Sequence, residues 1–173
     1  AAETTLKVSS CLVRNHDQVE AFFKTFVEPL NAMSDKTGLT LNYIGGPEVT
    51  PWQKQAPALQ RGLIDIINCP SAYYHTQVPA ARVAGVNNVS PTEIRKNGGM
   101  EIMQDAWKQG LNAMILGWGH WEASRFFLYT KFAPKEDPKL GIDLTGMKIR
   151  STPLYSDFLK AMNATAVTIA PDD

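Results

Sequence analysis

The feature that most constrains the fold of this chain is the alternation of short apolar segments with longer segments of helical periodicity. Residues 6–13, 39–43 and 63–68 are short and apolar or alternating, which is typical of strands. Between the first two, residues 19–33 carry apolar side chains at helical spacing, and Gly38 stands where that helix would end. Strands joined by helices run parallel with right-handed crossovers, so the sequence predicts an α/β fold.

The second half of the chain continues this pattern less regularly. We expect a helix from Ser90 to about Gly110, strands over 112–117 and 126–130, and a charged, proline-containing loop over 135–139. A strand–helix–strand unit follows over 147–151, 155–162 and 166–169. The last residues, a proline followed by acids, resemble the start of a helix, so we expect the sequence to be truncated there.

Composition excludes several classes of function. The chain has 173 residues, with 17 Lys plus Arg and 17 Asp plus Glu. A net charge of zero and the lack of a dense basic run argue against a nucleic-acid binder, which needs a basic face. There is no apolar run of 18 or more residues that would span a membrane. The opening Ala1-Ala2-Glu3 is typical of a mature export product after cleavage of a signal peptide.

The two cysteines, Cys11 and Cys69, form neither a metal-ligand set nor a CxxC pair. We interpret them first as two small buried apolar residues. A disulfide is the alternative and would need an oxidising compartment. The two residues end the first and third expected strands, which would be neighbours in this fold, so a bond between them is geometrically possible.

Motifs for catalysis, cofactors and metals are scarce. The chain has no GxSxG, HExxH, P-loop or complete GxGxxG sequence. Its three histidines, His16, His75 and His120, lie far apart in the sequence, and we expect no metal and no cofactor. An enzyme would need a nucleophile or base with an orienting partner, and His16 with Asp17 or His120 with Glu122 are the only sequence-local pairs.

The geometry of open α/β sheets points instead to a binding site. Ligands bind outside the carboxyl ends of the strands in such sheets. Aromatic side chains with polar tips, beside glycine and polar residues, suit a small organic ligand there. Ordinary packing is the alternative for each aromatic residue. The candidates at the expected strand ends are Arg14, Asn15, Glu48, Ser71, Tyr73, Tyr74, Trp118, Trp121 and Glu122.

Arg150 is a separate candidate because it follows a short apolar strand and precedes an expected helix. A guanidinium offers two parallel N–H groups to the two oxygens of a carboxylate, and a nearby helix N-terminus adds positive charge. A surface or structural arginine is the alternative interpretation.

Several separated segments resemble one family, the solute-binding proteins of tripartite ATP-independent periplasmic (TRAP) transporters. The resembling sequences are Ala-Leu-Gln-Arg-Gly-Leu-Ile-Asp at 58–65, Leu-Thr-Gly-Met-Lys-Ile-Arg at 144–150 and the helix-like stretch 155–165. Gly-Gly-Pro-Glu-Val at 45–49 and Pro-Ser-Ala-Tyr-Tyr at 70–74 resemble one branch of the family.

The resemblance implies a periplasmic-binding-protein-like (type II) fold of two α/β lobes that close on a ligand. Residues 1–122 would form the first lobe, and 123–173 a hinge strand and the start of the second. Such proteins are not enzymes; they deliver small organic acids from the periplasm to membrane permease subunits. The family's carboxylate-binding arginine maps onto Arg150, and Arg125 lies near the place of a second. A sensor domain of the same fold, or a small-molecule enzyme on an α/β lobe, is the alternative.

Overall fold

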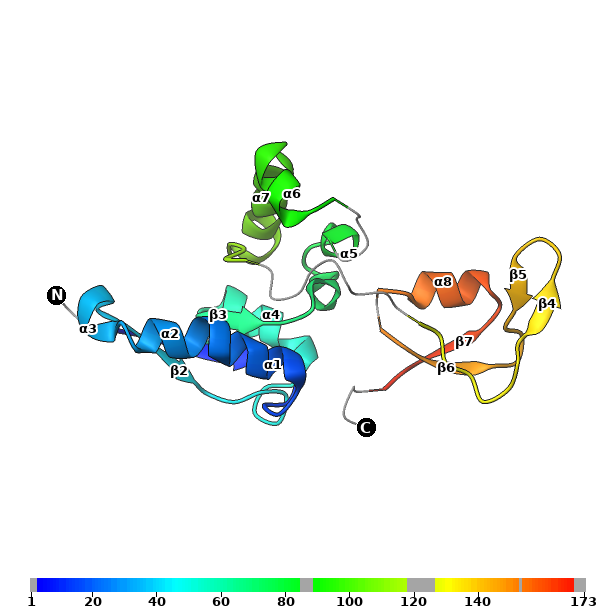
Figure 1. Cartoon of the computed structure of the whole chain (residues 1–173), viewed down its shortest axis with the longest axis horizontal. Coiled ribbons are helices and arrows are strands. Elements are labelled where there is room, and N and C mark those ends of the chain that lie inside the picture. Colours follow the sequence, from blue (N-terminus) through cyan, green and yellow to red (C-terminus); the bar gives the residue numbers. More distant parts are fainter. Residues whose placement is uncertain (1–2, 85–88, 118–126, 153, 170–173) are drawn as a thin grey trace. The chain divides into compact units, whose positions relative to one another are not determined.

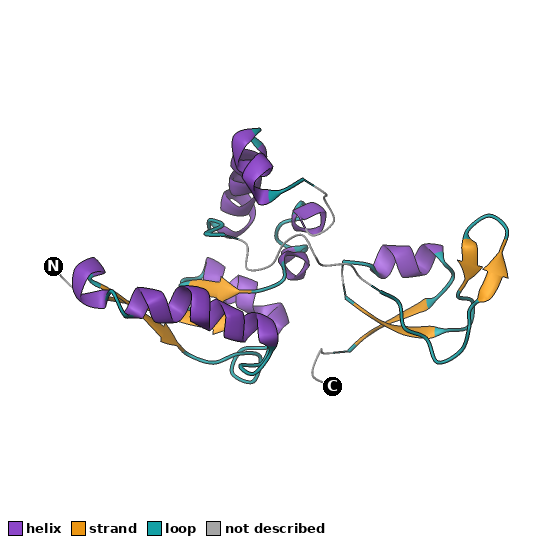
Figure 2. Cartoon of the chain, viewed as in Figure 1, coloured by secondary structure: helices purple, strands orange, loops and turns teal. Residues whose placement is uncertain are grey.

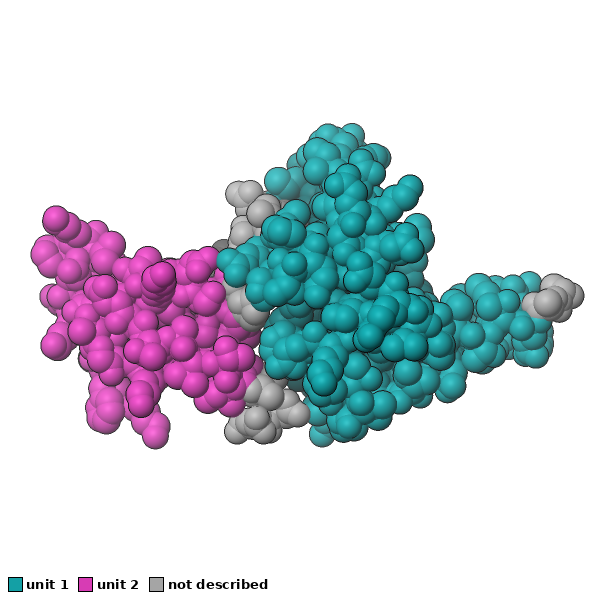
Figure 3. Space-filling model, turned by 180° about the vertical axis from the view of Figure 1, so that it is seen from behind, with its two compact units in different colours: residues 1–122 teal, residues 123–173 magenta. Residues whose placement is uncertain are grey.

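The computed structural model describes residues 3–84, 89–117, 127–152 and 154–169. The chain divides into two compact units, Ala1–Glu122 and Ala123–Asp173 (Figure 3). We call them unit 1 and unit 2 and treat each by itself. The alternation of helices and strands in each unit can be followed in Figure 2.

Unit 1 is organised around a three-stranded parallel sheet (Figure 1). The strands are β1 (Thr4–Ser10), β2 (Leu39–Tyr43) and β3 (Ile66–Asn68), in the order β2-β1-β3. In the register of this sheet Leu6 lies opposite Leu41, and Val8 lies opposite both Tyr43 and Ile66. The three strands predicted from the sequence are found, so the parallel α/β arrangement is confirmed. β2 has the predicted bounds, β1 begins two residues and ends three residues earlier than predicted, and β3 begins three residues later.

One face of this sheet is covered by the helical segment that follows β1. It consists of α1 (Asp17–Phe22), a π-helical turn η1 (Phe23–Val27) and α2 (Glu28–Asn31). The buried residues Val8, Val27 and Leu41 form the centre of this layer. Phe22, Phe23, Phe26, Leu30 and Ile66 pack against them.

The other face is covered by α4 (Trp52–Gln60), against which the 3₁₀ turn η2 (Ser71–Tyr74) and α7 (Gly99–Leu111) pack. Successive side chains of a strand point to opposite faces of its sheet. Accordingly, Ile66 packs in the first layer and its neighbour Ile67 packs in the second. The sheet is therefore sandwiched between two helical layers, as expected for parallel strands. The second layer contains Cys11, Ala56, Tyr73, Tyr74, Val78, Ala81, Trp107 and Leu111 as buried residues.

Unit 1 departs from the prediction in the region after β3. The helix expected from Ser90 is divided into α6 (Pro91–Lys96) and α7 at Gly98, whose φ of 86° is left-handed. The strand expected over 112–117 is absent from the described residues. Instead, the Gln104 side chain pairs with both backbone groups of Ile115, at 2.8 Å each, and replaces a neighbouring strand. The other short helices are α3 (Ser34–Thr37) and α5 (Ala81–Ala84).

The described residues of unit 2 form two pairs of strands and one helix, and the strand expected over 126–130 is absent from its described part, 127–130. Strands β6 (Lys148–Ser151) and β7 (Thr165–Thr168) are parallel and flank α8 (Ser156–Ala161), as predicted. The expected loop over 135–139 is wrong, because β4 (Lys135–Asp137) pairs antiparallel with β5 (Gly141–Asp143). Asp137 Oδ1 accepts hydrogen bonds from the backbone amides of Lys139 and Leu140 and closes this hairpin. Leu144, Leu159 and Met162 form the core of the unit.

Cys11 and Cys69 form a disulfide, with their Cα atoms 5.0 Å apart. The first interpretation of them as two reduced apolar residues is therefore wrong, and the alternative holds. The bond is possible because β1 and β3 are adjacent and parallel, so the residues that follow their carboxyl ends come together. None of the described helices is both long and apolar enough to cross a bilayer.

Candidate functional site

The candidate site of unit 1 lies where its three strands end. Because the strands are parallel, Ser10, Tyr43 and Asn68 finish at one edge of the sheet. Three loops leave this edge: 11–16 after β1, 44–51 after β2 and 69–70 after β3. We call them the carboxyl-edge loops. They carry the candidates Arg14, Asn15 and Glu48, and side-chain hydrogen bonds and a disulfide fasten them to one another.

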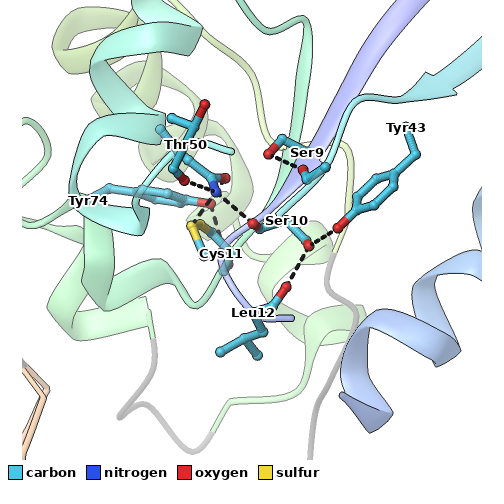
Figure 4. Close-up of a disulfide and its surroundings, with 10 residues drawn as sticks. Ser9, Ser10, Cys11, Leu12, Tyr43, Thr50 and Tyr74 are labelled. Carbon is cyan, nitrogen blue, oxygen red and sulfur yellow. Dashed lines mark hydrogen bonds between the residues drawn. A yellow bond between two sulfur atoms is a disulfide. The ribbon is translucent and has the colours of Figure 1, made fainter. Parts of the chain in front are cut away.

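A chain of hydrogen bonds joins the end of β2 to the loop after β1 (Figure 4). The Ser10 hydroxyl lies 2.7 Å from the carbonyl oxygen of Leu12 and 2.8 Å from the Tyr43 hydroxyl. A carbonyl only accepts, so the single Ser10 proton is donated to Leu12. The Tyr43 hydroxyl must then donate to Ser10. Burial raises the pKa of Tyr43, which keeps the phenol protonated and able to donate.

Tyr43 also supports the position of Arg14. The Phe23 ring packs edge-on against Tyr43, with the ring centroids 5.0 Å apart. The Arg14 guanidinium lies on the Phe23 ring, 3.6 Å from its centroid. Phe23 is the first residue of the π-helical turn, a distortion often found at functional sites. The arrangement holds an exposed cation beside the carboxyl edge of the sheet.

The loop after β2 depends on Gly45 and Gly46. Gly45 has a φ of 118°, which a residue with a side chain rarely adopts. A Cβ atom at Gly46 would lie 2.9 Å from Glu48 Oε2 and 3.1 Å from both the Leu12 carbonyl oxygen and the Tyr43 hydroxyl. Glu48 turns back onto this loop, where its Oε1 accepts a 2.7 Å hydrogen bond from the Gly46 amide.

Gln55 joins the loops from inside the molecule. Its Nε2 donates to the carbonyl oxygens of Ser10 and Thr50, at 2.6 and 2.9 Å. The first contact reaches the end of β1 and the second reaches the loop after β2. The disulfide then ties Cys11 to Cys69 in the loop after β3. The Tyr74 hydroxyl donates to the Cys69 carbonyl at 3.4 Å, and burial raises the pKa of this phenol.

The structure accounts for the two predicted tyrosines through packing. Tyr73 and Tyr74 are both buried in the second helical layer of unit 1. Tyr73 stacks on Trp52 with ring centroids 4.4 Å apart, and Tyr74 packs edge-on against Trp107. For these two rings, the surroundings therefore match ordinary packing, the alternative given in the sequence analysis.

The remaining candidates of unit 1 have different surroundings. Asn15 is exposed in the loop after β1, and Ser71 is half-buried at the start of η2. Glu48 is exposed apart from its contact with Gly46. Trp118, Trp121 and Arg125 lie outside the described residues.

Arg150 stands on β6 in unit 2, opposite Val167 of β7. It is the third residue of a four-residue strand rather than the residue that follows it. The side chain is exposed, and its Nε donates a 3.2 Å hydrogen bond to the carbonyl oxygen of Ile169. This bond limits the rotation of the guanidinium, and among the described residues its Nη1 and Nη2 groups make no hydrogen bond.

Sequence reasoning missed two residues that organise the carboxyl edge. Tyr43 is the last residue of a predicted strand, a position that could have identified it. Gln55 lies in the middle of α4 and is completely buried. No local sequence signal distinguishes it from the polar residues on the exposed side of that helix.

Known structures with a similar fold are periplasmic binding proteins, although no protein-family model matches the chain. A TRAP periplasmic solute-binding protein from a Sulfitobacter species, with bound β-D-galacturonate, has a TM-score of 0.68 at 16% identity, over 96% of this chain and 55% of that chain. One from Chromohalobacter salexigens, with bound D-glucuronate, has a TM-score of 0.67 at 18% identity, over 95% and 55%.

A third similar structure is a TRAP periplasmic solute-binding protein from Fusobacterium nucleatum with bound sn-glycerol-3-phosphate. Its TM-score is 0.62 at 19% identity, over 96% of this chain and 54% of that chain. The chain thus spans about half the length of the structures it matches. Its fold is that of about half of a TRAP periplasmic solute-binding protein, of the type II α/β class that the sequence resemblance implies.

Proposed function

We propose that the chain is the ligand-binding part of an extracytoplasmic solute-binding protein that captures a small organic carboxylate for a TRAP-type transporter. The observation that carries the proposal is Arg150, a guanidinium whose rotation is limited within a fold of this class. Unit 1 would correspond to the first lobe, and unit 2 to the hinge strand and the start of the second. The protein would work without a catalytic step, with permease subunits as its partners.

The binding step follows from the chemistry of Arg150. The hydrogen bond from its Nε to Ile169 leaves the end of the guanidinium, with Nη1 and Nη2, for a ligand. Two parallel N–H groups match the two oxygens of a carboxylate, and the limited rotation reduces the entropy lost on binding. A lysine at this position would present only a point charge.

The carboxyl-edge loops carry further candidate ligand contacts. Asn15 and the Arg14 cation lie in the loop after β1, and Ser71 begins η2 directly after the third loop. All three offer hydrogen-bond donors to hydroxyl or carboxylate oxygens. Trp118, Trp121 and Arg125 lie outside the described residues and remain proposed ligand contacts. Galacturonate and glucuronate, bound in the two uronate complexes above, combine a carboxylate with several hydroxyls and are suitable probes.

The disulfide supports a periplasmic location for this function. Disulfides persist in oxidising compartments, among which the bacterial periplasm is one. The Cys11–Cys69 bond is therefore in keeping with a periplasmic location.

Titration calorimetry with D-galacturonate tests the proposal, and D-galactose is the matched control because it lacks only the carboxylate. We expect galacturonate to bind and galactose to bind much more weakly. Arg150→Ala should lose roughly 2–5 kcal/mol of binding free energy, as for one partner of a buried charge pair. Arg150→Lys should also weaken binding, because an ammonium cannot make the bidentate contact.

Lys148→Ala is the control variant for these titrations. Lys148 is an exposed cation two residues away on the same strand, so it reports any general effect of positive charge. Its loss should leave the affinity nearly unchanged. If Arg150→Ala binds galacturonate as tightly as the wild type, Arg150 is not part of the site.

A further inference from the structure

The side-chain oxygen of Gln55 is a buried hydrogen-bond acceptor in unit 1 that lacks a donor among the described residues when the disulfide is formed. Gln55 is completely buried, and both Nε2 protons are used by the carbonyl oxygens of Ser10 and Thr50. Its Oε1 lies 3.5 Å from Cys11 Sγ. A sulfur in a disulfide carries no proton, so this distance is a contact and not a hydrogen bond in the oxidised protein. Among the described residues, Oε1 has no other contact with a donor.

A buried acceptor without a donor calls for an explanation, since nearly all such groups in folded proteins are paired. Reduction of the disulfide would supply the missing donor. The Cys11 thiol would then carry a proton at a sulfur already within hydrogen-bonding distance of Gln55 Oε1. In the oxidised form the disulfide links the loops, and Gln55 Oε1 lacks a donor in the part of the chain that the structure describes. In the reduced form the link is lost, and the Cys11 thiol donates a hydrogen bond to Gln55 Oε1.

We propose that the Cys11–Cys69 disulfide is a reversible redox clamp on the carboxyl-edge loops. In the reduced state, Gln55 Oε1 accepts a hydrogen bond from the Cys11 thiol. The oxidised clamp holds the three loops in one arrangement. Reduction releases the loop after β3 from the loop after β1, while Gln55 keeps Cys11 in place. The effect on ligand affinity rests on the proposed function, because these loops carry candidate ligand contacts.

The redox step is ordinary thiol–disulfide exchange with a dithiol reductant. Cys69 is half-buried and Cys11 is buried, so we expect the reductant thiolate to attack Cys69 Sγ. Cys11 leaves as a thiolate and takes up a proton. The second thiol of the reductant then displaces Cys69 as a thiol and closes the reductant's own disulfide. Two electrons and two protons pass to the protein, and an oxidant reverses the step.

Amide hydrogen exchange of the whole chain, before and after reduction with dithiothreitol, tests the clamp without any ligand. We expect exchange at Cys69 and over 71–75 to rise by about tenfold or more, as for a local opening, while α7 and the loop after β2 stay protected. Reoxidation should restore the original rates. A uniform rise that includes α7, or a change confined to Cys11 and Cys69, would overturn the proposal.

Two double variants test the role of Gln55. In Cys11→Ser with Cys69→Ala, the serine hydroxyl can donate to Gln55 Oε1 as the reduced thiol would. In Cys11→Ala with Cys69→Ala, that donor is missing. We expect the first variant to have the higher thermal midpoint and both to show the fast loop exchange of the reduced protein. Equal thermal midpoints would show that a donor to Gln55 Oε1 does not stabilise the protein, and would overturn the role proposed for Gln55.

Galacturonate titration of the oxidised and reduced chain gives the functional readout. We expect reduction to weaken binding by about tenfold or more, and reoxidation to restore it. Equal affinity in both forms would overturn the link between the clamp and the ligand. If the oxidised chain binds no carboxylate at all, the proposed function fails, and the exchange experiment still decides whether the clamp exists.

Discussion

Unit 1 and unit 2 each carry candidate ligand contacts, but they hold them on very different scaffolds. In unit 1 the sheet is covered on both faces, and its edge loops are fastened by Tyr43, Gln55 and a disulfide. The part of unit 2 that the structure describes has one small buried cluster, and Tyr129, Phe132 and Phe158 are among its exposed large apolar residues. The loops of unit 1 are therefore positioned by a deep core, while Arg150 stands on a parallel strand pair with little core behind it.

The largest effect is expected from truncating a buried leucine to alanine in the core of each unit, because the two cores differ in size. Leu111 in unit 1 and Leu159 in unit 2 are each 1% exposed. Truncation of either to alanine should cost about 2–5 kcal/mol through lost burial and a cavity. Unit 1 should stay folded with a lower thermal midpoint, because many other buried residues surround Leu111. Unit 2 should unfold locally, because Leu159 belongs to a core of three buried residues.

Hydrogen exchange resolved by segment measures this difference. Leu159→Ala should abolish the protection of α8 and β6 and leave that of β1 unchanged. If Leu159→Ala and Leu111→Ala reduce protection equally within their own units, the two scaffolds do not differ as described.

A smaller effect is expected from the edge of unit 1. Gly46→Ala would place a Cβ atom against the Leu12 carbonyl oxygen, the Tyr43 hydroxyl and Glu48. We expect a loss of about 1–3 kcal/mol, the range for overpacking, measured by denaturant unfolding. Gly117→Ala is the matched control, because the space around that position is open and its φ is not left-handed. Equal stability of the two variants would contradict this prediction, because it would show that the loop accommodates a Cβ atom at position 46 without cost.

The smallest effect concerns Asp143 at the edge of unit 2. Hydrogen bonds from the Thr145 hydroxyl and amide lower the pKa of this carboxyl below its usual value. A carboxyl with a lowered folded-state pKa stabilises the fold above its unfolded pKa and loses that contribution as the pH falls through the folded value. The loss should therefore occur below about pH 4.

Asp143→Asn keeps the shape of the side chain and removes its titration. The protection of β5 and α8 should fall in the wild type as the pH drops below about 4, and fall less in the variant. The difference should be small because the carboxyl is exposed. Identical pH profiles would show that Asp143 contributes nothing to the stability of unit 2.

The sequence predicts elements best where local pattern and burial agree. The alternation around Leu39 to Tyr43 and the strand at Arg150 are both found. The strand expected over 112–117 fails because the Gln104 side chain occupies the backbone groups of Ile115, a contact between distant residues. The hairpin was missed because β4 itself has no apolar residue and its turn is organised by the polar side chain of Asp137.

The candidate site was harder to predict than the fold. Positions at strand ends identify the carboxyl-edge loops, since parallel strands all end at one edge. They do not reveal which side chains face inward: Tyr73 and Tyr74 are core residues, and the buried Gln55 has no sequence signature. The orientation of Arg150 depends on the Ile169 carbonyl, 19 residues further along the chain.

Native mass spectrometry of the purified chain, beside a denaturing spectrum of the same sample, tests the central claim most directly. The chain should have a mass of 19.1 kDa and carry a small organic acid that is lost on denaturation. Addition of galacturonate should replace that acid or fill an empty site, and Arg150→Ala should carry neither. A wild-type chain that stays bare in saturating galacturonate, or equal occupancy in the variant, would contradict a carboxylate site built on Arg150.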